Sequence, residues 1–583
     1  MPRSVICLGL SVFSALAITV HALEGRDPGV ASTDGLVVCT SAPACDAGAA
    51  ILARGGNAVD AAVATGFALA VTHPSAGNIG GGGFMLVRTP SGRTTSFDFR
   101  EKAPGKSTPT MYLDQHGNID RSLTNAGYLA PGVPGTVRGF EAAHRKFGKL
   151  PWRDVVMPGV ELAERGFEVS AALARSLNTE LKRMAPFPAS VAAYGKPGGG
   201  DWTAGDRLVL TDLGRTLRAI ATEGPDAFYK GWIADRIAAD MAANGGLITR
   251  TDLAAYRAKE RTPVKGRYRG FEIVSMPPPS SGGVALIEML NVLEPMNLKS
   301  LGLLTPPALH AQVEAMRRAY LDRARYLGDP DFSRIPVSRL TAKSHARQVA
   351  ASIDSSHASR SDALGQDLLT RSSTEEPDET THYSVTDRGG MAVATTYTLE
   401  GGFGSHVVVA GAGFLLNNEM GDFNKKPGTT NDTGDIGTAP NVIAPGKRML
   451  SSMTPTLVSR DGRLVLVTGS PGGRTIINTV LAVVLGVTEY GLTGREAVDL
   501  PRIHHQWMPD RVAVEEDRLP ADTLDRLRAM GHDVQTASRQ GDAHSIWIGP
   551  DGRAYGVNDT RTPDSKASIP AMPANLTARP AGR

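Results

Sequence analysis

A threonine, Thr380, stands at the sharpest change of character in this sequence. Before it runs a polar, weakly hydrophobic stretch, roughly residues 352–379, which indicates an exposed loop. After it, residues 382–399 alternate as in a β-hairpin, with a turn at residues 387–390. A hydroxyl residue that opens a strand directly after an exposed loop suits a chain that cuts itself before Thr380.

The chemistry of such a cut is specific. A threonine hydroxyl is a weak nucleophile without a base, but the α-amine freed on the same residue has a pKa of about 7.7–8.0 and can accept the hydroxyl proton. Thr380 would then supply both nucleophile and base. The competing interpretation is that Thr380 and Thr381 merely open a strand, since threonine is common in strands.

Several longer motifs accompany these threonines in a fixed order. They are DFRE at 98–101, PPPSSGG at 277–283, TTHYSV at 380–385, LLNNEMGDF at 415–423, LSSMTPT at 450–456 and GSPGG at 469–473. Together they resemble the gamma-glutamyltransferase (glutathione hydrolase) family. The resemblance extends over about residues 35–564, which is nearly all of the chain that would remain after removal of a leader.

The resemblance implies an α+β fold, the four-layer αββα sandwich of the N-terminal nucleophile hydrolases. It also implies a zymogen that cuts itself between Glu379 and Thr380. The expected products are a large subunit, residues 23–379, and a small catalytic subunit, residues 380–583, which stay together. Thr380 would take the γ-glutamyl group from glutathione or a related compound and pass it to water, an amino acid or a dipeptide. No cofactor or metal is implied.

One arginine and three acids are candidates for holding the substrate. A guanidinium can hold a carboxylate through two parallel hydrogen bonds, and the resemblance assigns this role to Arg100, which alone would more commonly form a surface ion pair. Glu400, Glu419 and Asp422 would be costly in one pocket without a cation. A substrate ammonium meets that need, so we expect the amino-acid group to lie between these acids and Arg100. Solvated loop acids are the competing interpretation.

The resemblance adds further polar groups to the site. It places Thr398 within hydrogen-bonding reach of the nucleophile, and it places Ser451 and Ser452 on the substrate carboxylate. Family members carry either asparagine and glutamine or two glutamates at the positions of Glu400 and Glu419. The glutamates here leave the balance between hydrolysis and transfer open.

Gly472 and Gly473 lie between a predicted strand, residues 464–468, and a helix from residue 475. Successive backbone N–H groups that enter a helix form an anion site. An oxyanion on the acyl carbonyl would be stabilised there by roughly 2.7–4 kcal/mol per donor. A simple strand-to-helix turn is the alternative.

The segment 423–447 is long, polar and glycine-rich, which predicts a mobile lid over the glutamyl site. After Phe423 it contains no aromatic residue, so a gate built on an aromatic wall is not expected. Residues 104–350 look mainly helical and are interpreted as scaffold.

Two other patterns invite a different function. The glycine run at 77–83 follows a helix and opens a strand, the reverse of the order that a phosphate loop needs, so we interpret it as tight backbone packing. Adjacent His504 and His505 have no third ligand at a recognisable spacing, and we interpret them as structural.

The N-terminus and composition indicate an exported enzyme. Residues 1–22 read as a secretory signal, with Arg3 followed by an apolar run, although an uncleaved anchor is the alternative. A periplasmic or secreted protein without stable membrane association is expected. Once the signal has left, Cys39 and Cys45 remain, either as a small disulfide loop or as two buried thiols. The net charge of +3 in 583 residues gives no case for nucleic-acid binding.

Two rival functions stay open at this stage. One is a related cephalosporin (glutaryl) acylase, whose substrate lacks the α-amine; the retained acids argue against it. The other is no enzyme at all but an uncleaved periplasmic protein that binds glutamyl peptides.

Overall fold

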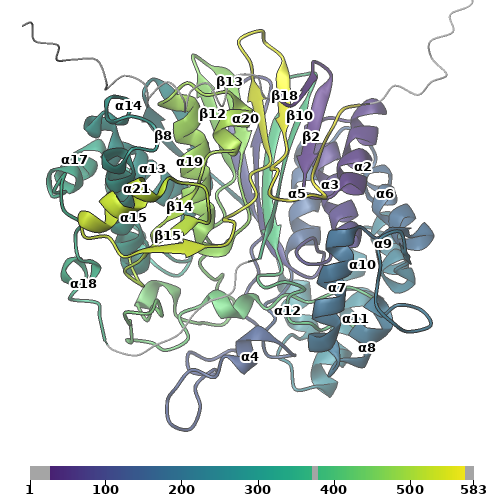
Figure 1. The fold of residues 1–583 in the computed structure, drawn as a ribbon. Helices are drawn as coiled ribbons and strands as arrows, with labels where there is room; N and C mark the ends of the chain where they lie inside the picture. The colour runs from purple at the N-terminus through teal and green to yellow at the C-terminus, as the bar shows by residue number, and fades with distance from the viewer. Residues whose placement is uncertain (1–26, 371–378, 571–583) are drawn as a thin grey trace, which may run out of the picture.

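The computed structural model describes residues 27–370 and 379–570. Two seven-stranded sheets lie face to face in the centre, and helices cover both outer faces (Figure 1). This four-layer arrangement confirms the predicted α+β sandwich. The predicted signal, the residues just before Glu379 and the last part of the C-terminal tail lie outside the described residues.

The first sheet carries the hairpin expected after Thr380. Its strands, in spatial order, are β19 (Lys566–Ser568), β2 (Gly35–Cys39), β10 (Thr381–Asp387), β11 (Ala392–Thr398), β3 (Gly82–Arg88), β4 (Thr94–Asp98) and β7 (Lys259–Arg261). β10 pairs antiparallel with β11, and Thr381 lies opposite Tyr397. Because β2 pairs with the other edge of β10, the strand that follows Thr380 is held on both sides.

The second sheet lies against the first. Its strands, in spatial order, are β1 (Val30–Ser32), β18 (Ala554–Val557), β17 (Ser545–Ile548), β13 (Arg463–Thr468), β12 (Thr456–Arg460), β9 (Phe271–Ser275) and β8 (Val264–Tyr268). Side chains of alternate residues, such as Leu36 and Ala394 from the first sheet and Leu457 and Ile546 from the second, form an apolar cluster between the two. β17 and β18 pair antiparallel as a C-terminal hairpin.

Alanine-rich helices cover the outer face of the first sheet. α3 (Ala58–Thr72) is buried along its whole length, which its nearly continuous apolar sequence predicts. A capping box between Asn57 and Asp60 starts it. The other helices of this side are α2 (Ala42–Ala53), α5 (Thr136–Phe147), α6 (Trp152–Arg165), α7 (Ala171–Met184), α8 (Pro188–Tyr194), α9 (Thr211–Glu223), α10 (Asp226–Tyr229), α11 (Trp232–Ala243) and α12 (Arg250–Ala255). The short helix α4 (Ser122–Asn125) lies apart from them, at the bottom of the view in Figure 1. The short strands β5 (Phe167–Glu168) and β6 (Arg207–Leu208) pair beside them.

The second sheet has its own helical layer (Figure 1). It contains α13 (Gly282–Leu293), α14 (Leu298–Leu301), α15 (Pro306–Tyr326), α16 (Val337–Leu340), α17 (Lys343–Ala351), α18 (Ser361–Leu364), α19 (Ile476–Thr488), α20 (Gly494–Val498) and α21 (Ala521–Ala529). A small sheet of β14 (Ile503–His504), β15 (Val512–Glu515) and β16 (Val534–Ala537) lies beside α15 and α21. Among the described residues, no helix is both long and apolar enough to cross a membrane.

The stretch predicted as an exposed loop before Thr380 is largely exposed where the structure describes it, but it contains α18, and Leu369 forms a β-bridge with Thr430. Part of the C-terminal tail is also ordered, because β19 pairs with β2. This strand covers an edge of β2 whose backbone groups would otherwise lack partners. Nearby, Cys39 and Cys45 form a disulfide, which decides between the two alternatives for these residues.

Candidate active site

Two threonine hydroxyls converge on one backbone carbonyl. Thr380, directly before β10, donates a hydrogen bond from its hydroxyl to the carbonyl oxygen of Glu379 (2.7 Å). Thr398, at the end of β11, donates to the same oxygen (2.9 Å) and accepts from the N–H of Glu400 (2.8 Å). The peptide bond between Glu379 and Thr380 is therefore held by the ends of two paired strands.

The glycine run at 77–83 holds Thr398 in place. The side chain of Asn78 donates to the carbonyl of Thr398 (2.8 Å). A Cβ atom on Gly81 would lie 2.1 Å from that carbonyl oxygen, so only glycine fits the approach. These contacts confirm the interpretation of this run as tight backbone packing.

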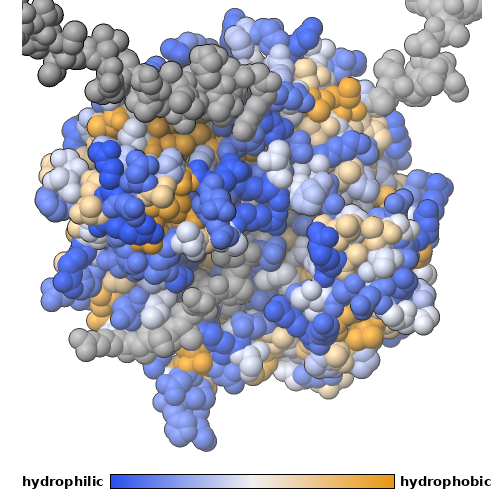
Figure 2. Space-filling model, viewed as in Figure 1, coloured by the Kyte–Doolittle hydropathy of each residue, from blue (hydrophilic) through white to orange (hydrophobic). Residues whose placement is uncertain are grey.

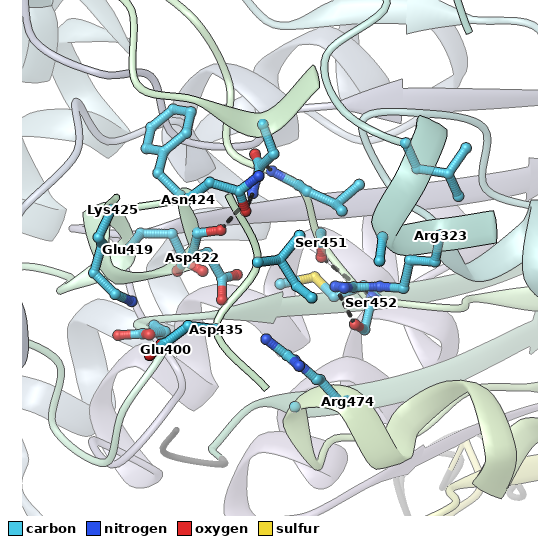
Figure 3. A pocket seen from close by; sticks show the side chains of 18 of the residues that line it. Arg323, Glu400, Glu419, Asp422, Asn424, Lys425, Asp435, Ser451, Ser452 and Arg474 are labelled. Atoms are coloured by element: carbon cyan, nitrogen blue, oxygen red, sulfur yellow. Dashed lines mark hydrogen bonds between the residues drawn. The ribbon is translucent and has the colours of Figure 1, made fainter. Parts of the chain in front are cut away.

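A narrow pocket of about 60 Å³ opens beside Thr380 (Figure 3). It is lined by nine of the ten predicted site residues: Arg100, Thr380, Thr398, Glu400, Glu419, Asp422, Ser451, Ser452 and Gly473. The tenth, Gly472, lines a wider cavity of about 590 Å³, whose wall also includes Glu379 and Thr380. The two cavities thus meet at the predicted cleavage point.

Arg100 lies fully buried just after β4 and is surrounded by acids. Its guanidinium forms ion pairs with Glu419 and Asp422, and Nη1 lies 3.6 Å from Glu101. It also donates to the carbonyl oxygens of Met449 (3.4 Å) and Leu450 (3.3 Å). Burial alone would lower the pKa of Arg100, but the neighbouring carboxylates outweigh burial and raise this pKa.

The sequence led us to expect the acids on the opposite side of the substrate from Arg100. Instead, two of them, Glu419 and Asp422, contact Arg100 directly. The reason is that buried carboxylates need a positive partner in a medium of low dielectric constant. Burial raises the pKa of Glu419 well above its ordinary value, and Arg100 opposes this effect. Burial likewise raises the pKa of Glu101 to about 7, again against Arg100. The pocket therefore holds acids that bind a positive group readily.

The two serines lie before β12, and Ser452 contacts an arginine that the sequence did not indicate. Arg323 of α15 donates to the hydroxyl of Ser452 (3.0 Å) and to the hydroxyl of Ser281 (3.0 Å). Ser281 in turn donates its hydroxyl to the carbonyl of Ser451 (2.6 Å). Arg323 lies within a helical stretch that looked like scaffold, and only the chain's tertiary folding brings it to the pocket.

The predicted lid forms part of the pocket wall. Residues from Asn424 to Asn441 line the pocket, with Lys425 and Asp435 turned toward it (Figure 3). Asp435 forms an ion pair with Arg121 (2.5 Å), and Lys425 donates to the carbonyl of Gly421. The segment's position fits a lid; its mobility stays a prediction.

The two glycines of the GSPGG motif have backbone conformations that favour glycine. Gly472 has φ +119° and Gly473 has φ +50°. They lead into the short helix η4 (Gly473–Thr475) and then α19, and the carbonyl of Gly472 accepts from the N–H of Thr475 (2.9 Å). The strand-to-helix turn is thus present, and its service as an oxyanion site stays a prediction.

Basic side chains also line the wide cavity. Arg474, Arg511 and Arg539 line it, together with His504 and Asp542. His504 hydrogen-bonds Asn478 (2.7 Å) and Gln506 (2.8 Å), which fits its interpretation as structural. Burial lowers the pKa of His504 to about 4, so this ring is neutral near pH 7.

Two stacked sheets between helical layers, with a threonine at the start of a central strand, define the class of N-terminal nucleophile hydrolase folds. Comparison with known proteins is more specific. The model of the gamma-glutamyltranspeptidase family matches residues 44–569, and the chain therefore belongs to this family. The "Glutathione hydrolase proenzyme" of Escherichia coli (strain K12) is 48% identical over 535 residues, which cover 92% of each chain.

Solved structures agree with this assignment. The cephalosporin acylase from Bacillus halodurans superposes with a TM-score of 0.81 at 25% identity and covers 97% of this chain and 99% of its own. The gamma-glutamyltranspeptidase of Helicobacter pylori has a TM-score of 0.53 at 46% identity, covering 54% of this chain and 90% of its own. The first match extends over nearly the whole fold, and the second has the higher sequence identity.

Proposed function

We propose that this protein is a self-processing gamma-glutamyltransferase that hydrolyses glutathione and related γ-glutamyl amides. Family membership and the high identity to a glutathione hydrolase proenzyme support the activity. The observation that carries the self-processing is the convergence of the Thr380 and Thr398 hydroxyls on the carbonyl of Glu379.

Cleavage would begin with attack by the Thr380 hydroxyl oxygen on the carbonyl carbon of Glu379. As charge develops on the carbonyl oxygen, the Thr398 hydroxyl already donates to it and stabilises it. The peptide C–N bond then breaks, the nitrogen takes up the hydroxyl proton, and an ester links Glu379 to Thr380. Water hydrolyses this ester and leaves Thr380 with a free α-amine and a free hydroxyl.

Turnover would reuse the same hydroxyl, with the new α-amine as its base. The hydroxyl attacks the γ-carbonyl of the substrate, and the backbone N–H groups of Gly472 and Gly473 stabilise the oxyanion. The departing amine takes the proton, and the glutamyl group remains as an ester on Thr380. Water or the amine of an amino acid or dipeptide then releases it.

Substrate binding would rearrange the charges around Arg100. The guanidinium already pairs with Glu419 and Asp422. A substrate α-carboxylate would replace one acid on Arg100, and the displaced acid, with Glu400, would receive the substrate ammonium. Ser451 and Ser452 would complete the carboxylate site. Such an exchange keeps every buried charge paired, which is what a pocket of low dielectric constant requires.

An acylase for glutaryl amides is the second candidate, because the cephalosporin acylase from Bacillus halodurans shares nearly the whole fold. The three acids argue for a substrate with an α-amine. Rates with glutathione and with a glutaryl amide of the same leaving group separate the two candidates.

Export is part of the proposal. The predicted signal would be removed after residue 22, and the disulfide between Cys39 and Cys45 fits an oxidising compartment such as the periplasm or the exterior. The mature enzyme would consist of residues 23–379 and 380–583.

Substitution of Thr380 by alanine tests the proposal most directly. The variant should remain one chain on a denaturing gel and show no turnover, whereas N-terminal sequencing of wild-type protein should find a second terminus at Thr380. Thr381→Ala is the matched control, because the buried Thr381 hydroxyl makes no hydrogen bond. This control should still cleave. An active Thr380→Ala protein would refute the assignment.

A further inference from the structure

A second group of ionisable side chains lies away from the pocket, among three helices that cover the second sheet. Glu288 of α13, Asp322 of α15 and His345 of α17 bring one ligand atom each within 4.8 Å of one another. His345 Nε2 lies 3.2 Å from Asp322 Oδ2 and 3.5 Å from Glu288 Oε1. Figure 1 shows the three helices on the left of the molecule.

Glu288 makes this group unusual. Its side chain is only 2% exposed, and its Oε1 has no hydrogen-bond partner. Burial raises the pKa of Glu288 well above its ordinary value, and the nearby carboxylate of Asp322 raises this pKa further. A buried carboxyl group of this kind needs either a proton or a cation.

Among the described residues, no arginine or lysine forms an ion pair with Glu288 or Asp322. His345 can supply a positive charge to both carboxylates only when its ring is protonated. Arg339 is near enough to act on both carboxylates, but its guanidinium lies over the ring of Tyr326, 4.6 Å from the centroid.

A second group of side chains has the spacing of metal ligands, but its carboxylate is already paired. His310, Glu314 and His532 also gather within 4.8 Å. There, however, Glu314 is paired with both Arg317 (3.2 Å) and Arg318, and it accepts from the N–H of Ser359 (3.0 Å). That carboxylate is satisfied, so the group needs no ion.

We propose that Glu288, Asp322 and His345 bind one divalent transition-metal ion of the zinc or manganese kind. Zinc binds nitrogen and carboxylate oxygen at about 2.0–2.2 Å, so the corners of its tetrahedron lie roughly 3.3–3.6 Å apart. The two measured separations from His345 Nε2 are close to this spacing before any rearrangement. One imidazole and two carboxylates also form a donor set that suits these ions better than magnesium or calcium.

The surroundings permit an ion to enter. Asp322 and His345 keep 17% and 18% of their side-chain surface exposed, so water can reach the ion and complete its coordination. Glu288 closes the site from within. The ion would be a structural clamp between α13, α15 and α17.

The proposed metal site is adjacent in sequence to residues of the narrow pocket. Asp322 immediately precedes Arg323, which donates to Ser452, and α13 begins directly after Ser281, the other acceptor of Arg323. An ion that ties α13 to α15 would therefore steady the contacts of Arg323. Its effect on turnover should be small compared with its effect on stability.

Metal binding by the mature protein, purified without a histidine tag and freed of metal by a chelator, tests the proposal. Titration calorimetry with Zn²⁺ and Mn²⁺ should show one site, and the Tm should rise with ion concentration. Mg²⁺ should bind more weakly. His345→Gln should weaken Zn²⁺ binding at least about 10-fold, since it removes one of three ligands.

His357→Gln is the matched control, because His357 is 76% exposed and lies outside the group. This control should bind Zn²⁺ like the wild type. Glu288→Gln provides a second variant: it should fold and lose the metal-dependent rise in Tm. The proposal fails if wild-type protein shows no saturable site, or if His345→Gln and Glu288→Gln both retain wild-type affinity. It also fails if Zn²⁺ leaves the wild-type Tm unchanged, which would mean that Glu288 is simply protonated.

Discussion

The two cavities that meet at Thr380 differ in size and in the state of their charges. The narrow pocket, of about 60 Å³, contains the buried Arg100 bound to the buried Glu419 and the half-buried Asp422. The wide cavity, of about 590 Å³, is lined by arginines from separate loops, including the exposed Arg539. The charges of the narrow pocket are paired with one another, whereas the wide cavity is open to solvent.

This difference indicates how selectivity is divided between the two sides of the reaction. Buried charge pairs are costly to leave incomplete, so the narrow pocket rejects any ligand that does not restore the pairing. Charges at a wetted surface are screened and contribute little each. The acyl side should therefore be strict, and the side that receives the leaving group and the acceptor should be permissive.

The largest expected effect comes from Arg100→Lys, which keeps a positive charge but loses the two-pronged geometry. We expect kcat/KM for glutathione to fall at least about 30-fold, because disturbing one partner of a buried charge pair costs roughly 2–5 kcal/mol. Self-cleavage should persist, because Thr380 and Thr398 are untouched. Steady-state kinetics and a denaturing gel check both points. Unchanged kinetics would mean that the narrow pocket is not the acyl site.

A smaller and selective effect is expected from Asp422→Asn. The substitution removes a charge but keeps the shape, and the Asp422 side chain is 33% exposed, so folding should tolerate it. Turnover of glutathione should fall roughly 10- to 100-fold, in line with a charged hydrogen bond of about 1.5–3 kcal/mol. Turnover of a glutaryl amide, which has no ammonium, should fall much less. Equal losses for both substrates would remove Asp422 from the ammonium site.

The smallest effect is expected in the wide cavity. Arg539→Ala should raise the KM for a dipeptide acceptor about two- to fivefold, the range for an exposed charge pair. Hydrolysis without acceptor should not change, and added salt should narrow the difference. Arg553→Ala, at an exposed position that does not line either cavity, is the control. A large loss of hydrolysis in Arg539→Ala would show that the wide cavity also binds the glutamyl group.

Local sequence carried much of the fold, and the resemblance of the motifs to a known family carried most of the site. The hairpin after Thr380, the buried helix α3 and the packing of the glycine run follow from local periodicity and from residue size. Nine predicted site residues line one pocket, because the motifs that carry them end strands or occupy turns at the same end of the sheets.

What local sequence could not indicate depends on tertiary contacts. Arg323 is an ordinary helical arginine until α15 packs beside Ser452. The acids were placed opposite Arg100 because sequence gives no distance between motifs, whereas burial draws Glu419 directly onto it. The strand at 566–568 was missed because its partner, β2, lies at the other end of the chain.

The order of strands within the sheets has a consequence for biosynthesis. β2 lies between β19 and β10, and β11 lies against β3, so segments from before and after position 379 alternate within one sheet. The other sheet alternates in the same way, with β18 beside β1 and β12 beside β9. If the two halves were translated separately, each would expose strand edges with unpaired backbone groups, which favour aggregation. If the chain is cut before Thr380 as proposed, we expect the uncut polypeptide to fold first and the two fragments to stay together afterwards, because their strands are paired with one another within both sheets.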